Sequence, residues 1–155
     1  MFEALQNTGV SVWVREANSL LAFPGILTLH TMGLGLLVGA AAVLNLRLLG
    51  MGGRVPLAPM RELFRLMWIG FVVNAVTGTL LFAADAVRRG TSVLFLAKLL
   101  LVAGGILTMV LIKRNVFGPS ADPVKPSTTA KRLALASLLI WSAAITAGRL
   151  LAYVE

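Results

Sequence analysis

The sequence predicts an all-α integral membrane protein, in which four helices form a bundle and an N-terminal helix lies in the membrane interface. Of its 155 residues, 58% are hydrophobic and only 13% are charged, which is too apolar for an ordinary soluble domain. The apolar residues fall into four blocks, each close to the length of about 20 residues that a helix needs to cross a bilayer. Charged residues mark the ends of these blocks.

The four predicted spans cover residues 20–45, 63–86, 92–113 and 133–153. Pro24 falls in the first turns of the first span, where its missing N–H costs least. Residues 114–132 form the longest predicted loop, because its centre combines three prolines with Ser and Thr. The spans leave no room for a soluble domain. We therefore expect residues 1–155 to form a single transmembrane domain in the lipid bilayer.

The segment before the first span predicts a helix that lies along the membrane surface. Phe2, Leu5, Gly9, Val12 and Trp13 recur at helical spacing, and polar side chains occupy the positions between them. The indole ring of tryptophan suits the headgroup region, because it has an apolar body and one polar edge. We therefore expect an amphipathic interfacial helix.

The basic residues predict the orientation of the spans. Nine of the 14 Lys and Arg residues fall on one side of the four-span topology and five on the other. Because basic residues favour the cytoplasmic side, the loop 114–132 is expected there and both termini outside. Asn45 and Arg47 on the inner side, together with Arg61 and Arg65, are expected to contact lipid headgroups and to set the topology. The same rule explains the net charge of +8, so we expect no nucleic-acid partner.

The composition excludes several kinds of site chemistry. The chain has no cysteine and one histidine, so it forms no disulfide, iron–sulfur cluster or cysteine nucleophile. It contains no nucleotide-binding loop, no HExxH motif and no Ser-His-Asp arrangement. We expect the chain not to be an enzyme on its own.

His30 is the outstanding candidate for a functional residue. It lies about 15 Å into the first predicted span, at a depth where a polar side chain is costly without a partner or a function. Asn74 and Ser142 are expected at similar depth, so the three residues predict a polar layer. A neutral imidazole binds haem iron or hydrogen-bonds a quinone, which predicts haem b or a quinone at His30, with Asn74 beside it. Alternatively, His30 is a packing group that hydrogen-bonds Asn74 or a backbone carbonyl.

Charged residues gather at the outer boundary of the predicted bundle. Asp85, Lys98 and Arg149 come to a similar height on three different spans. They are expected either to tie the helix ends together as ion pairs or to form a cationic mouth. In the second case Lys98 and Arg149 would bind haem propionates, a quinol headgroup or an acidic periplasmic partner.

Small residues mark the expected contacts between helices. Gly35 and Gly39 form a small-xxx-small pattern on the first span, and Gly70 and Gly78 share one stripe of the second span with Asn74. Both faces are predicted to pack against helices rather than lipid.

Several segments together resemble an uncharacterised family of short four-helix bacterial inner-membrane proteins. These segments are Trp13, Asn18-Ser19, Phe23-Pro24, Leu29-His30, Gly33, Leu46–Gly50, Met67–Gly70, Asn74, Gly78 and Gly148–Tyr153. The resemblance implies an inner-membrane location, with the outer side being the periplasm. More distantly, the first span is similar to those of copper-resistance-type membrane proteins and small b-type membrane cytochromes, whose histidines hold copper or haem. This chain has one histidine where the cytochromes have paired ligands.

These observations predict a membrane subunit of a bacterial respiratory or electron-transfer assembly, which binds haem b or a quinone near His30. Its expected partners are other membrane subunits, or further copies of the chain, and a periplasmic electron-transfer protein. Two alternatives stay open: a structural or assembly protein without a cofactor, and a metal-handling or transport protein of the copper-resistance type.

Overall fold

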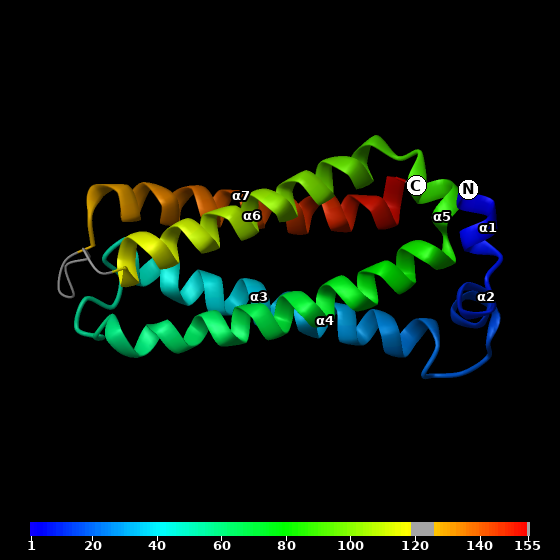
Figure 1. The fold of residues 1–155 in the computed structure, drawn as a ribbon, viewed down its shortest axis with the longest axis horizontal. Helices are drawn as coiled ribbons and strands as arrows, with labels where there is room; N and C mark the ends of the chain where they lie inside the picture. The colour runs from blue at the N-terminus through cyan, green and yellow to red at the C-terminus, as the bar shows by residue number, and fades with distance from the viewer. Residues whose placement is uncertain (119–125, 155) are drawn as a thin grey trace.

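The computed structural model describes residues 1–118 and 126–154, which form a bundle of four long helices with three short α-helices at one end (Figure 1). The elements in chain order are α1 (Phe2–Gln6), α2 (Gly9–Glu16), α3 (Phe23–Leu48), the 3₁₀-helix η1 (Ala58–Glu62), α4 (Leu63–Ala84), α5 (Ala86–Gly90), α6 (Val93–Phe117) and α7 (Thr128–Val154). Four helical segments are long and apolar enough to cross a membrane. The all-α membrane bundle predicted from the sequence is therefore confirmed.

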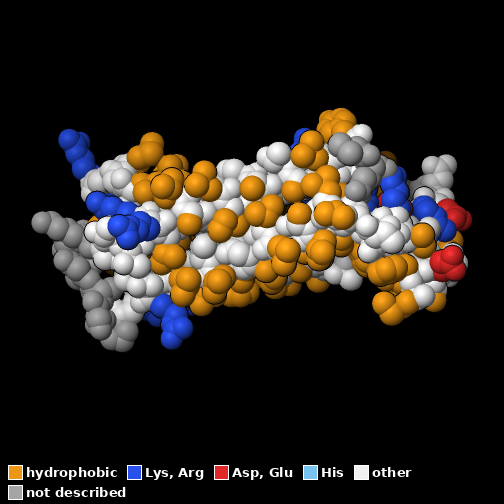
Figure 2. All heavy atoms as spheres, turned by 90° about the horizontal axis from the view of Figure 1, so that it is seen from above, with side chains coloured by type: hydrophobic (Ala, Val, Ile, Leu, Met, Phe, Trp, Pro, Cys, Tyr) orange, Lys and Arg blue, Asp and Glu red, His pale blue; other side chains and the backbone are white. Residues whose placement is uncertain are grey.

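The long helices are arranged in two pairs. Helix α3 packs along α4 and α6 packs along α7, while α3 also contacts α7. Both termini lie at the end where α1, α2 and α5 gather, and the last turns of α3 and α6 lie at the other end (Figure 1). Basic side chains are found at both ends, with apolar side chains between them (Figure 2). Large apolar side chains such as Leu100 and Leu139 are exposed along the helices, as expected of a surface that faces lipid.

Local sequence sets the ends of the long helices. Pro24 occupies the first turn of α3. At the other end of α3, Gly50 has a φ of 107°, and the N–H groups of Gly50 and Met51 bond to the carbonyls of Arg47 and Leu46. This pair of bonds is a Schellman motif, which needs a left-handed residue that glycine supplies without strain. Ser92 caps α6, because its Oγ accepts the N–H of Phe95 at 3.0 Å.

Two predicted segments differ from those in the structure. The interfacial segment forms two helices rather than one, because Thr8 caps α2 by accepting the N–H of Ser11 at 3.4 Å. The loop 114–132 is shorter than predicted, since α6 continues to Phe117 and α7 begins at Thr128. Phe117 packs edge-on against Phe64 with a ring separation of 5.7 Å, which explains the longer helix. Residues 119–125 of that loop lie outside the described residues.

The main apolar core fills the half of the bundle away from the termini. Its largest buried side chains are Leu37, Leu44, Met67, Ile112 and Trp141. A separate small cluster of Val14, Ile26 and Ala84 lies at the end near the termini. In that half of the bundle, the interior is left open for the cavity described below.

Asn45 and Arg47 are buried and bond to other groups of the chain rather than facing outward to lipid headgroups, so the prediction for these two residues is wrong. Asn45 is only 1% exposed, and its Nδ2 donates to Oγ of Ser137 on α7 at 3.0 Å. Arg47 donates from Nε to the carbonyl of Val55 at 2.6 Å and from a terminal nitrogen to the carbonyl of Gly53 at 3.2 Å. A buried polar side chain is costly unless it has a hydrogen-bond partner, and both residues find their partners within the chain.

Candidate functional site

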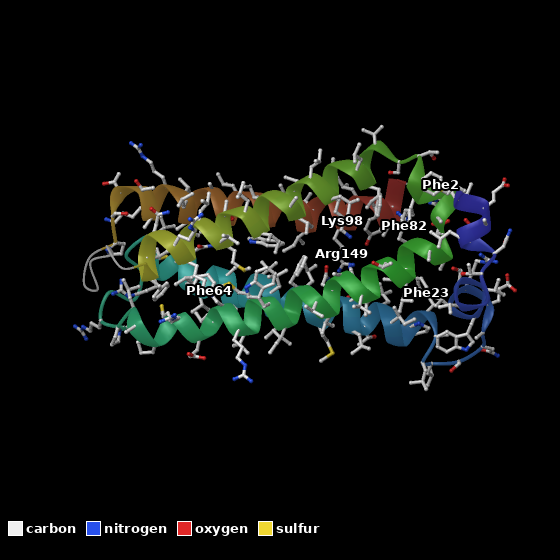
Figure 3. The ribbon with its side chains drawn as sticks, viewed as in Figure 1. Phe2, Phe23, Phe64, Phe82, Lys98 and Arg149 are labelled. Carbon is white, nitrogen blue, oxygen red and sulfur yellow. The ribbon has the colours of Figure 1, made fainter. Side chains whose placement is uncertain are left out.

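A cavity of about 650 Å³ lies among the long helices in the half of the bundle near the termini. Its polar lining comes from Arg15, His30, Asp85, Arg88, Arg89 and Lys98. Aromatic and aliphatic side chains, including Leu27, Phe82 and Phe95, line the rest. Figure 3 shows Phe82 and Lys98 in this half of the molecule and Phe64 in the other. All four long helices contribute, because Gly148 and Leu151 of α7 also line the cavity.

A close crossing of α3 and α4 positions His30. A β-carbon on Gly70 would lie 2.7 Å from the backbone oxygen of Gly33 and 2.6 Å from the backbone nitrogen of Leu37. Only glycine at this position lets the two backbones approach so closely. About two turns further along α4, Gly78 leaves space for the imidazole, since a β-carbon there would lie 3.0 Å from Cε1 of His30. The predicted Gly70/Gly78 contact face is confirmed.

Asn74 and His30 are direct hydrogen-bonding partners, the contact that the packing alternative for His30 expects. Nδ1 of His30 lies 3.1 Å from the backbone oxygen of Asn74, and Nδ2 of Asn74 donates to the backbone oxygen of His30 at 2.9 Å. His30 lies about 10 Å from the start of α3 at 1.5 Å per residue, because the helix begins at Phe23. It is therefore nearer the end of the span than the predicted midplane position.

Thr77 completes the hydrogen bonds of the imidazole. Its Oγ1 lies 3.1 Å from Nδ1 of His30 and donates its own proton to the carbonyl of Val73 at 2.6 Å. The carbonyl of Asn74 only accepts, so Nδ1 carries the ring proton and Nε2 has the lone pair. Nε2 has a long contact of 3.4 Å with Nδ2 of Asn74. The arrangement fixes the ring and leaves Nε2 as its basic atom.

Arg15 and Arg89 at the cavity mouth are held by other groups. Arg15 pairs with Glu16 at 2.8 Å and donates to the carbonyl of Ala84 at 3.3 Å, which ties α2 to the end of α4. Arg89 pairs with Asp85 at 3.2 Å and donates to the carbonyl of Leu151 at 3.0 Å. The ion-pair alternative for the outer charges therefore applies to these two arginines.

Lys98 differs from these arginines. It lines the cavity from α6 and is partly buried. Its Cε and Nζ lie 3.5 and 3.6 Å from the position of a β-carbon on Gly148, so its side chain crosses to α7. Within the described residues, no carboxylate lies within 4.0 Å of its ammonium group. Lys98 thus brings a positive charge to the same cavity as His30.

Two of the predicted polar residues lie away from the cavity. Arg149 is exposed and does not line the cavity, although its neighbour Gly148 does. Ser142 is also exposed, so it does not join His30 and Asn74 in a polar layer. Both residues lie on the outer face of α7, because α7 turns Trp141, Ala144 and Ala147 toward the interior.

In the part of the chain that the structure describes, no other helix approaches the Gly35/Gly39 face. No described atom outside the local helix lies within 4 Å of a β-carbon built on either glycine. Helix α3 uses Gly33 instead, two residues earlier. A contact of the Gly35/Gly39 face with another subunit stays a prediction.

Sequence reasoning missed three parts of the site. Thr77 lies three residues after Asn74 on the same helical face, a spacing that could have indicated it. Gly33 lies three residues after His30, but no sequence pattern favours it over Gly35 as the contact with α4. Arg15 reaches the cavity from α2, and no sequence pattern links it to α4.

The residues present suit an amphiphilic ligand better than a bare metal ion. Among the described residues, no group of three His, Asp or Glu side chains could hold a metal. Haem would find one candidate iron ligand in the cavity, His30, and cationic side chains that could pair with its propionates. A quinone would find the same nitrogen as a hydrogen-bond acceptor and an apolar wall for its ring.

The fold and the cavity define a multi-pass helical membrane protein with one histidine-lined, cationic site. The chain belongs to DUF6644, a family of unknown function, whose match covers residues 18–154. No curated protein and no solved structure matches the chain.

Proposed function

We propose that this protein is a membrane subunit of a bacterial respiratory or electron-transfer assembly, and that its cavity binds haem b or a quinone beside His30. One observation carries the proposal: the imidazole lines a large cavity and is held at Nδ1 by the oxygens of Asn74 and Thr77. Histidines that bind metals typically donate their other N–H to such an oxygen, which fixes the ring and increases its basicity. The same hydrogen bonds at Nδ1 leave Nε2 as the atom that can accept a proton from a quinol hydroxyl.

When bound, haem or quinone supplies the electron transfer, and the chain supplies position and charge. His30 contacts the cofactor, and Asn74 and Thr77 orient the ring. The stacked rings of Phe82 and Phe95, 5.1 Å apart and nearly parallel, form an apolar wall for a flat ligand. The imidazole of His30 packs closely against Gly78, and this contact keeps the imidazole from rotating.

A subunit role follows from what one chain provides. A single cofactor needs a donor and an acceptor of electrons, and no methionine or second histidine lines the described cavity as another haem ligand. We therefore propose that other membrane subunits, or a second copy, complete the path. Exposed Arg88, at the cavity mouth, suits an acidic periplasmic electron-transfer partner.

We propose the inner membrane as the location, with both termini in the periplasm. The nine-to-five distribution of basic residues supports this orientation. Both termini lie at the same end of the bundle as the cavity, so the cavity would open toward the periplasmic side.

A second candidate is a structural or assembly protein in which His30 only joins two helices. The observation that favours it is that both ring nitrogens already have partners within the chain. The copper-resistance alternative has less support, because the described residues offer no cluster of metal ligands within one chain.

Purification from the native membrane separates these candidates. The protein, extracted gently with its partners, should carry stoichiometric haem, seen in a reduced-minus-oxidised spectrum, or quinone, seen in an organic extract. Redox subunits should co-purify with it. A native complex with neither cofactor would reject the proposal in favour of the structural role.

A further inference from the structure

Among the described residues, the lining of the cavity has more positive than negative charge. Its described lining contains four cationic side chains, Arg15, Arg88, Arg89 and Lys98, and one carboxylate, Asp85. Arg15 and Arg89 already form ion pairs and bond to backbone oxygens. The excess is therefore concentrated on Lys98 inside the cavity and on Arg88 at its mouth.

Lys98 is the informative member of this set. It lies about 7.5 Å into α6 from Val93, within a segment that is apolar enough to span a membrane. A lysine near a helix end normally extends its ammonium toward the water, yet this side chain crosses to Gly148 of α7 and lines the cavity. A cation in such a place is costly unless an anion joins it.

The remaining lining is apolar. Phe82 and Phe95 stack across α4 and α6, and Leu27 of α3 also contributes. An occupant must therefore offer a hydrocarbon or aromatic body to these side chains and a negative charge to Lys98.

We infer that the cavity binds an amphiphile with an acidic group, whose carboxylate or phosphate pairs with Lys98 while its apolar body contacts Phe82, Phe95 and Leu27. This inference rests on the proposed function for the cavity, and it narrows the ligand class. A neutral quinone lacks the acidic group, whereas haem b has two propionates. A fatty acid or a lipid phosphate supplies the same chemistry without any redox role.

The test uses the full chain in nanodiscs of phosphatidylcholine, with dansyl-labelled undecanoic acid and its methyl ester as a matched pair of probes. Fluorescence titration should show the acid binding at least about tenfold more tightly than the ester, as expected for one charge-assisted contact. Lys98→Gln should abolish this difference, and Lys98→Arg should keep most of it. Arg149→Gln removes one positive charge outside the cavity and should leave the difference unchanged.

Equal binding of acid and ester, or an undiminished difference in a folded Lys98→Gln variant, would overturn the inference. Competition then separates the sources of the acidic group. Displacement of the probe by haem b, with a spectrum that His30→Gln alters, supports both the inference and the proposed function. Displacement by oleate but not by haem supports the inference and contradicts haem binding. Displacement by a neutral quinone, together with equal binding of the acid and the ester, overturns the inference and leaves the proposed function standing.

Discussion

His30 on α3 and Asn74 on α4 are joined by hydrogen bonds in both directions. The imidazole Nδ1–H donates to the backbone oxygen of Asn74 at 3.1 Å, and the Asn74 amide donates to the backbone oxygen of His30 at 2.9 Å. Each side chain therefore satisfies a carbonyl on the opposite helix. Such a reciprocal pair fixes the register of the two helices at the point where the cavity begins.

The glycine crossing beneath this pair predicts a large effect of a small substitution. Gly70→Ala should destabilise the protein by about 1–3 kcal/mol, because the new methyl group meets backbone atoms of α3 that cannot move aside. Unfolding in detergent, followed by circular dichroism, measures the change. Gly39→Ala is the matched control, since it adds the same methyl group where nothing lies within 4 Å. Equal stability of the two variants would show that the crossing is not tight.

The buried pair Asn45–Ser137 predicts a measurable coupling between α3 and α7. A double-mutant cycle of Asn45→Ala and Ser137→Ala should give an interaction energy of about 0.6 kcal/mol, the average for hydrogen bonds between membrane helices. The unfolding free energies of the four proteins provide the value. Strict additivity of the two substitutions would mean that the 3.0 Å contact contributes nothing to stability.

Much of the fold could be predicted from the sequence, because long apolar blocks bounded by charges have few other solutions. The partnership of His30 with Asn74 could also be predicted, since polar side chains at similar depth in a bundle seek each other. The face of α3 that packs against α4 could not be predicted from the sequence. Gly33 and Gly35 lie two residues apart in an apolar stretch of α3, and only the packing of α4 selects Gly33.

The cavity was equally hidden from sequence reasoning. Lys98 and Arg149 look alike at the outer ends of two spans, but α7 turns Gly148 toward the cavity and Arg149 away from it. Successive residues on an α-helix point in directions about 100° apart. The rotation of α7 about its axis therefore decides which of its residues lines the cavity. That rotation depends on Trp141, which is 2% exposed and packs against Gly105.

Reporter fusions test the proposed orientation. A periplasmic reporter after Tyr153 and another before α1 should both be active, and a cytoplasmic reporter inserted in the turn between α3 and η1 should be active as well. The positive-inside distribution is the physical reason. Cytoplasmic activity of a fusion at the C-terminus would reverse the orientation and place the cavity mouth on the cytoplasmic side.

If His30 holds a redox cofactor, replacing it must remove that cofactor, and the cofactor content of a matched set of proteins measures this. The wild-type protein, His30→Gln and Thr31→Val would be purified from native membranes, and their haem and quinone measured per chain. His30→Gln keeps hydrogen bonding but removes the basic nitrogen, whereas Thr31 is exposed and bonds only to the carbonyl of Leu27 at 2.9 Å. We expect cofactor in the wild type and in Thr31→Val, and its loss from an inserted, folded His30→Gln protein. Undiminished cofactor in His30→Gln, or none in the wild type, would contradict the account.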